Sequence, residues 1–303
     1  LTEEQLTAVY NSAARRKGVP ALSAREKQQV FDQVVEDELL YREAVRLGAY
    51  LHVMTEDAVA TAARVDAAIA RGEAIPALAG GPWAVKDTIL VAGPPTTASS
   101  KILEPYVAAY DATAIAKLKA HDAVLLGKTN CDEFAMGSST ETSAYRKTVN
   151  PWDPTTVPGG SSGGAAAAVA ADCGVAALGS DTGGSIRQPA SLCGVVGLKP
   201  TYGSVSRHGL IAMASSFDVI GPLTRTVSDA RAIFAAIAGR DVYDATSADA
   251  PPRTGAPART RVQDLRVGIP KEYFASGIDP DVASSVREAV RTIEGLGCRV
   301  EEV

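Results

Sequence analysis

The sequence predicts an α/β fold in which helices surround a central, mostly parallel sheet. Helical patterns are repeatedly followed by short apolar runs, and such α-then-β units build mostly parallel sheets. The composition agrees, because 46% of the residues are apolar and 21% are charged, as in globular proteins. A chain of 303 residues is long enough to bury one large core or two small ones.

The N-terminal part of the chain is predicted to be helical. Ser23 and Glu26 have the spacing of a capping box, which marks the start of a helix. Apolar residues then recur at helical spacing before Gly48, at Val30, Phe31, Val34, Val35 and Leu39. We therefore expect two helices within residues 1–48, and we treat 1–50 as a helical N-terminal segment ahead of a domain that comprises 51–303.

Helices and strands are predicted to alternate along the rest of the chain. Thr55 is expected to cap an alanine-rich helix that ends at Gly72, and an apolar strand over 83–85 then leads into Lys86. The later elements are a helix from Thr113, a strand at 123–127, a helix at 165–171, strands at 175–178 and 265–269, a helix capped by Asp279 with Pro280 at its first position, and a strand at 298–303. Residues 239–261, rich in Asp, Ala, Pro and Thr, are predicted to form a surface connection.

Charge and hydropathy exclude several classes of protein. The net charge of -5 argues against a nucleic-acid surface on this chain, because phosphate binding needs clustered Lys and Arg. No run approaches the roughly 18 apolar residues of a membrane helix, and the N-terminus lacks the zones of a signal peptide. The sequence therefore predicts a cytoplasmic or organelle-internal protein.

The cysteines and histidines show no metal-binding pattern. The four cysteines lack C-x-x-C spacing, which favours reduced, structural residues over a zinc site: Cys131, Cys173, Cys193 and Cys298. The three histidines offer neither metal-ligand spacing nor an obvious base: His52, His121 and His208. We expect no metal ion and no cofactor in this chain, and a chemistry that works without histidine.

Two loops rich in Gly and Ser are the densest signal in the sequence. They have the sequences PGGSSGG (residues 158–164) and GSDTGGSIR (residues 179–187), and a predicted helix and strand lie between them. Such loops suit tight turns or a backbone that approaches a ligand closely. A flexible linker, a phosphate cradle and purely structural turns are the alternatives, although no G-x-x-x-x-G-K-[ST] spacing occurs.

The second loop also suits nucleophilic catalysis. In this hypothesis the Ser185 hydroxyl attacks a carbonyl, and the backbone N–H groups of residues 182–185 stabilise the developing oxyanion. Serine needs a base, and without a suitable histidine the base is expected to be a lysine whose pKa is lowered by its surroundings. Lys86 is best placed, at the end of a strand, although taken alone it fits better as an ordinary partner of Asp87 or another carboxylate. Spacing alone does not choose between Lys86 and Lys128.

These residues resemble the amidase signature family. The likeness extends from about residue 51 to 303 and rests on G-G-S-S-G-G followed by G-x-D-T-G-G-S-I-R. It implies a mixed central sheet flanked by helices and a Ser-Ser-Lys triad, with Lys86 as base, Ser161 as proton relay and Ser185 as the nucleophile that forms an acyl-enzyme. It also implies a cis peptide bond between Gly160 and Ser161. The oxyanion hole would be the backbone of Thr182, Gly183, Gly184 and Ser185, and three side chains would hold the loops: Ser162, Asp181 and Arg187.

Within this family, the chain is similar to the glutamine-hydrolysing components of tRNA-dependent amidotransferases. The segments that carry this likeness are 127–130, 132–141, 207–212, 244–249 and 270–274. The resemblance implies that glutamine is hydrolysed to glutamate and ammonia. The ammonia would pass to the B and C subunits, which amidate Glu-tRNA(Gln) or Asp-tRNA(Asn) for protein biosynthesis. ATP and Mg²⁺ would be used by a partner, and this chain would meet tRNA only through the complex.

Parts of the chain depart from the family pattern. Residues 1–50 do not resemble the family's N-terminal helices, Cys131 stands where methionine is common, and His208 stands where tyrosine is common. Family members also continue beyond the position of Val303, so we expect the domain to be incomplete at its C-terminus. A stand-alone amidase that acts on small amides and an inactive fragment that serves as an assembly module are the alternative functions.

Overall fold

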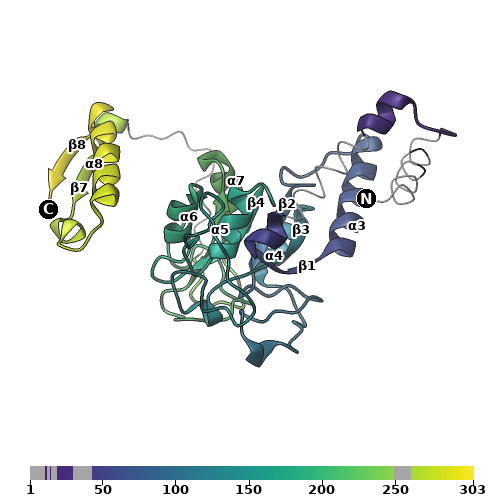
Figure 1. The fold of residues 1–303 in the computed structure, drawn as a ribbon, viewed down its shortest axis with the longest axis horizontal. Helices are drawn as coiled ribbons and strands as arrows, with labels where there is room; N and C mark the ends of the chain where they lie inside the picture. Colours follow the sequence, from purple (N-terminus) through teal and green to yellow (C-terminus); the bar gives the residue numbers. More distant parts are fainter. Residues whose placement is uncertain (1–10, 12–13, 15–18, 30–42, 249–260) are drawn as a thin grey trace. The chain divides into compact units, whose positions relative to one another are not determined.

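The computed structural model describes residues 11, 14, 19–29, 43–248 and 261–303 (Figure 1). These residues belong to two compact units, Leu1–Pro252 and Arg253–Val303. The predicted capping box is confirmed: the backbone N–H of Ser23 donates to Glu26 Oε2 at 2.9 Å, and that of Glu26 donates to Ser23 Oγ at 3.3 Å. Residues 30–39, on which the N-terminal helix prediction also rests, and residues 249–260 of the predicted connection lie outside the described residues.

The first unit is built on a six-stranded mixed sheet, which confirms the predicted fold class. Its strands lie in the order β1 (Tyr50–Val53), β3 (Val124–Thr129), β2 (Pro82–Lys86), β4 (Ala176–Asp181), β6 (Val219–Thr224) and β5 (Val196–Gly197). The central strand β2 is parallel to both β3 and β4, whereas the outer pairs are antiparallel. The carboxyl ends of β2, β3 and β4 therefore share one edge of the sheet.

The two faces of the sheet are covered by different helices. Successive side chains of a strand point to opposite faces, so Trp83 and Val85 join one core while Ala84 joins the other. The first core includes residues of α4 (Thr113–Ala120) and α7 (Val227–Ile237), and the second includes residues of α5 (Gly163–Ala170) and α6 (Arg187–Cys193). The serine loops precede α5 and α6, so they approach the sheet on the Ala84 face.

Helix α5 packs against the backbone just before β1 and just after β3. Its residues from Gly163 to Val169 are all buried, and only glycine, alanine and valine occur among them. A Cβ atom added at Gly164 would come within 2.6 Å of the Ala49 carbonyl oxygen and 2.7 Å of the Asn130 nitrogen. The small residues are thus what allows α5 to pack here, because a larger side chain would overlap with the backbone beneath it.

The start of helix α3 (Thr55–Ala70) differs from the prediction. Thr55 is the first residue of the helix rather than its cap, since the N-cap is Met54 and no side chain caps the first turn. The chain leaves β1 at Val53, so only Met54 remains for the cap position and Thr55 already has helical geometry. Two short 3₁₀ helices, η1 (Lys101–Leu103) and η2 (Glu133–Ala135), lie in the loops that follow β2 and β3.

The second unit has its own small sheet and one long helix. Strands β7 (Arg266–Ile269) and β8 (Arg299–Glu302) are parallel and are connected through α8 (Pro280–Gly295). The predicted cap is confirmed, because the Asp279 side chain accepts a hydrogen bond from the backbone N–H of Asp281 at 2.8 Å. The 3₁₀ helices η3 (Val262–Asp264) and η4 (Lys271–Phe274) flank β7.

Two further features concern membrane spans and cysteines. No helix among the described residues combines the length and the apolar character needed to cross a bilayer. All four cysteines are free thiols: Cys131, Cys173, Cys193 and Cys298.

Candidate active site

The candidate site lies at the edge where the parallel strands β2 and β4 end. Lys86 is the last residue of β2, and Ser180 and Asp181 are the last two residues of β4. Because β2 and β4 are parallel neighbours, their carboxyl ends meet at this edge. The second Gly/Ser loop leaves β4 at this edge and leads into α6, and the first leads into α5.

Lys86 is completely buried and contacts two serines. Its Nζ donates hydrogen bonds to Ser161 Oγ at 2.6 Å and to Ser180 Oγ at 2.9 Å, and it lies 3.4 Å from the Ser180 carbonyl oxygen. The exposed fractions of Lys86 and Ser161 are both 0%. No carboxylate forms an ion pair with Lys86 among the residues that the structure describes.

Burial changes the acidity of this lysine. Removal from water disfavours the charged ammonium and lowers the pKa of Lys86 to about 8, although Cys131, Asp132, Asp181 and Asp218 act in the opposite direction. About one tenth of Lys86 is therefore a neutral amine at pH 7, and about half is neutral at pH 8. Such an amine is able to accept a proton, as a general base must.

Lys128, the other lysine considered, has a different environment. In the sheet register Lys128 lies opposite Val85, so it belongs to the other face from Lys86. Its Nζ donates to the Ile89 carbonyl at 2.5 Å and lies 3.4 Å from Asp87 Oδ1. Asp87 is thus the ion-pair partner of Lys128, and the geometry leaves Lys86 as the lysine beside the serines.

Ser161 follows a cis peptide bond, as the resemblance implied. The backbone N–H of Gly160 donates to Gln188 Oε1 at 2.8 Å, and the Ser161 carbonyl accepts from the backbone N–H of Asp132 at 3.3 Å. A Cβ atom at Gly160 would overlap with the Asp132 carboxylate, so the loop passes here only because this residue is glycine. The relay position is therefore held by contacts on both sides of Ser161.

Ser185 lies next to this loop. The backbone N–H of Ser162 donates to the Ser185 carbonyl at 3.1 Å, and Ser162 Oγ donates to the Ser180 carbonyl at 3.1 Å. Ser162 thus connects both loops with the end of β4, which agrees with a supporting position. Ser185 itself is buried, with an exposed fraction of 7%.

The loop before Ser185 offers unused donors. Within the described part of the chain, the backbone N–H groups of Gly183, Gly184 and Ser185 donate no hydrogen bond. Unused, fixed N–H groups beside a nucleophile are what an oxyanion hole requires. The side chain of Thr182 is held as well, since its Oγ1 donates to Asp218 Oδ1 at 2.6 Å.

Asp181 and Arg187 close this loop. Asp181 Oδ2 accepts from the backbone N–H of Ile186 at 3.0 Å and from Arg187 Nε at 3.0 Å, while Oδ1 accepts from Arg187 Nη2 at 2.9 Å. Burial raises the pKa of Asp181, but these hydrogen bonds outweigh burial and hold its pKa below the ordinary value. The carboxylate therefore stays ionised and fixes both ends of the 182–186 turn.

Three residues of this site were missed from the sequence. Ser180 contacts Lys86, Gln188 holds Gly160, and Asp218 holds Thr182. Ser180 could have been found, because it lies near the end of the strand next to Lys86. Gln188 and Asp218 act over long sequence separations that no local pattern reveals.

Cys131 and His208, the two single residues that depart from the family pattern, differ in their relation to these groups. Cys131 is fully buried, its Sγ lies 3.1 Å from Ser99 Oγ, and burial raises the pKa of its thiol to about 11. His208 is stacked between the rings of Tyr110 and Tyr243, with centroids 4.9 and 4.8 Å away. The Cys131 thiol affects the pKa of Lys86, whereas His208 packs in the aromatic stack.

Comparison with known proteins gives a consistent picture. The family model described as Amidase matches residues 40–303. The chain is 56% identical over 258 residues to the A subunit of glutamyl-tRNA(Gln) amidotransferase from Moorella thermoacetica, a match that covers 85% of this chain and 53% of that protein. The chain thus spans about half the length of the curated relatives it matches.

Solved structures show the same likeness. The structure of the A subunit of glutamyl-tRNA(Gln) amidotransferase from Thermotoga maritima is similar with a TM-score of 0.73 and 52% identity, over 76% of this chain and 51% of that one. A native peptide amidase from Stenotrophomonas maltophilia is similar with a TM-score of 0.75 and 33% identity, over 97% of this chain and 61% of that one.

Proposed function

Because the chain belongs to the amidase family, we propose that it carries the catalytic centre of an amide-hydrolysing enzyme whose substrate is glutamine. One observation carries the chemistry: the buried amine of Lys86 lies 2.6 Å from Ser161 Oγ with no carboxylate paired to it in the described part of the chain. The relatives named above carry the choice of glutamine, since two of them are components of glutamyl-tRNA(Gln) amidotransferases.

The proposed first half-reaction starts with neutral Lys86. The amine takes the hydroxyl proton of Ser161, and Ser161 takes that of Ser185, whose Oγ attacks the carboxamide carbon of glutamine. The negative charge that forms on the carbonyl oxygen is stabilised by the N–H groups of residues 182–185. When the C–N bond breaks, the relay returns the proton to nitrogen, so that ammonia leaves and a glutamyl ester of Ser185 remains.

The second half-reaction restores the enzyme. Water attacks the ester carbonyl, and its proton passes through Ser161 to Lys86. The C–O bond to Ser185 then breaks, Ser185 regains a proton from the same relay, and glutamate is released. The same groups therefore act in both directions, first as base and then as acid.

The proposal extends to partners. The ammonia would be used by B and C subunits that amidate Glu-tRNA(Gln) or Asp-tRNA(Asn), with ATP and Mg²⁺ bound by a partner and tRNA bound through the complex. Similarity to the amidotransferase components from Moorella thermoacetica and Thermotoga maritima supports this assignment. The net charge of -5 supports a tRNA-binding surface on another chain of the complex, because a phosphate surface needs clustered cations.

The decisive experiment uses the full-length protein assembled with its partners. Ammonia release from glutamine is measured together with covalent labelling by a serine-reactive fluorophosphonate, and Ser185→Ala is the control. We expect glutamine-dependent ammonia and labelling, both lost in Ser185→Ala. Labelling without ammonia from glutamine would overturn the substrate, and absence of labelling in the parent protein would point to an inactive assembly module.

A second candidate is an amidase that acts alone on small amides. The likeness to the Stenotrophomonas peptide amidase, over 97% of this chain, is the observation that favours it. The full-length protein without partners should then hydrolyse small primary amides faster than glutamine. A strict requirement for partner subunits would decide against this candidate.

A further inference from the structure

A short turn behind the nucleophile loop connects this loop to the rest of the unit. The carboxylate of Asp218 accepts hydrogen bonds from the backbone N–H groups of Met213 at 2.9 Å and Ala214 at 3.1 Å, which close the turn 213–218. The same carboxylate accepts from Thr182 Oγ1 at 2.6 Å. Asp218 is only 2% exposed, so this contact is shielded from water. Any shift of the turn is therefore transmitted to Thr182.

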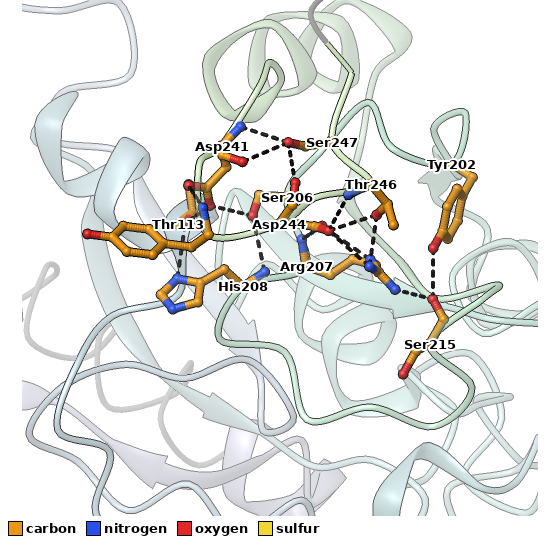
Figure 2. Close-up of polar contacts among 11 residues, drawn as sticks. Thr113, Tyr202, Ser206, Arg207, His208, Ser215, Asp241, Asp244, Thr246 and Ser247 are labelled. Atoms are coloured by element: carbon orange, nitrogen blue, oxygen red, sulfur yellow. Dashed lines mark hydrogen bonds and ion pairs between the residues drawn. The ribbon is translucent and has the colours of Figure 1, made fainter.

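Arg207 holds the other side of this turn. The carbonyl oxygen of Ser215, inside the turn, accepts hydrogen bonds from Arg207 Nη1 and from the Tyr202 hydroxyl (Figure 2). The Arg207 guanidinium also lies over the Tyr202 ring, 5.2 Å from its centroid. The position of Arg207 thus decides where the turn lies.

Asp244 holds the Arg207 side chain in place. Asp244 Oδ1 accepts from Arg207 Nη2 at 2.9 Å, and Oδ2 accepts from Arg207 Nε at 3.2 Å and from its backbone N–H at 2.8 Å (Figure 2). Such a two-oxygen contact fixes the plane of the guanidinium, which an ammonium would not do.

The Asp244 side chain is itself held in place. Thr246 donates to Asp244 Oδ1 from its backbone N–H at 3.0 Å and from its hydroxyl at 2.7 Å. Burial raises the pKa of Asp244, but the hydrogen bonds from Arg207 and Thr246 outweigh burial and place its pKa well below the usual range. The carboxylate is therefore a fixed, ionised anchor on the 241–247 loop.

We propose that Arg207 and Asp244 are positioning residues for the oxyanion-binding loop. They set the turn 213–218, and the Asp218–Thr182 contact passes this position to the N–H groups of residues 183–185. Neither residue touches the reacting atoms. The inference rests on the proposed amide hydrolysis at Ser185, and it adds a chain of contacts from the 241–247 loop to the nucleophile.

The test is a double-mutant cycle on the full-length protein assembled with its partners. Arg207→Lys keeps the charge but loses the planar contact, and Thr182→Val removes the hydroxyl that Asp218 holds. The readout is the rate of fluorophosphonate labelling of Ser185, with kcat and KM for glutamine measured alongside. We expect each single variant to lower labelling and kcat about 10- to 100-fold with KM within about twofold.

The double variant separates positioning from mere structural support. If Arg207 acts through Thr182, the double variant labels no more slowly than the slower single variant, and Thr182→Ser restores labelling. Effects that multiply, or wild-type labelling in Arg207→Lys, would overturn the proposal. Asp244→Asn is the second variant, with the same expectation, if Arg207→Lys does not fold.

A matched control and a separate readout complete the design. Arg225→Lys makes the same exchange in an exposed ion pair, where Arg225 Nη2 lies 2.7 Å from Asp172 Oδ1, and should leave labelling unchanged. Labelling does not depend on glutamine. Failure of the glutamine proposal would therefore appear as lost ammonia release with normal labelling in the parent protein, and the cycle would still decide the role of Arg207.

Discussion

Lys86 and Lys128 lie at the ends of neighbouring parallel strands and are equally buried, yet their surroundings assign them opposite tasks. Lys128 lies 3.4 Å from the carboxylate of Asp87, whereas Lys86 contacts only serine oxygens. Burial lowers the pKa of both lysines, and for Lys128 the Asp87 carboxylate works against this effect. Burial alone therefore does not make a lysine a base. A buried lysine becomes one where no carboxylate holds its proton.

The largest effect is expected when the amine of Lys86 is removed. Lys86→Met should lower kcat and the labelling rate about 10⁴-fold, because members of a catalytic triad act as a unit. The protein should remain folded, since methionine is unbranched and similar in length to lysine. Stopped-flow or discontinuous ammonia assays on the assembled protein measure the rate. Activity within about tenfold of the parent protein would contradict the assignment of Lys86 as base.

The matching change at Lys128 should affect stability instead. Lys128→Met leaves the buried Asp87 without its counter-charge, and we expect the free energy of unfolding to fall by about 3–5 kcal/mol. Urea unfolding measures this loss. Lys128→Met combined with Asp87→Asn should recover much of it, because no unpaired charge remains. A stable Lys128→Met protein with lost activity would instead place Lys128 in the chemistry.

Lys86 should also determine how kcat and stability depend on pH. Only neutral Lys86 accepts a proton, so log kcat should rise with pH with unit slope and level off above the pKa of about 8. The unfolded chain holds this proton up to about pH 10.5 and the folded chain only up to about 8. The free energy of unfolding should therefore rise with pH across that window.

The contribution of Lys86 to stability must be separated from that of other titrating groups. The rise attributable to Lys86 amounts to about 3 kcal/mol and should be missing in Lys86→Met. Because other groups also titrate in this range, the measured quantity is the difference between the two proteins at each pH. Parallel curves would show that the pKa of Lys86 is not lowered by folding.

Ser180 is expected to give the smallest effect. Its hydroxyl accepts a hydrogen bond from Lys86 at 2.9 Å and so favours the charged amine. Ser180→Ala should shift the midpoint of the pH–rate profile to lower pH, with a loss in kcat of less than about tenfold. An upward shift of the midpoint would show that Ser180 does not stabilise the ammonium form.

Much of the fold follows from local patterns in the sequence. The Ser23 capping box and the Asp279 cap are confirmed because a cap depends on residues three or fewer positions apart. Strand β6 has no such signal. It contains Gly221 and Pro222, which normally mark turns, and it is a strand only because β4 and β5 pair with it on either side.

The candidate site was predictable to a different degree. Lys86 at a strand end and Ser185 in a glycine loop carry their own signals, but the choice of Lys86 over Lys128 came from family resemblance. The structure supplies the physical reason. In the sheet register Lys128 lies opposite Val85, so Lys128 belongs to the face of the sheet opposite to that of Lys86. Contacts such as Asp218 with Thr182 join residues 36 positions apart, and only the folded chain brings them together.

The burial of helix α5 also limits which substitutions the helix tolerates. Since its residues from Gly163 to Val169 lie directly on the sheet and Gly164 has no room for a Cβ atom, this helix acts as a spacer of fixed thickness under the loop of Ser161. In a library that replaces each residue by every other, Gly164 should tolerate no other residue, and residues 165–168 should tolerate little beyond glycine, alanine and serine. The small size of the side chains in α5 thus helps to set the distance between Ser161 and Lys86.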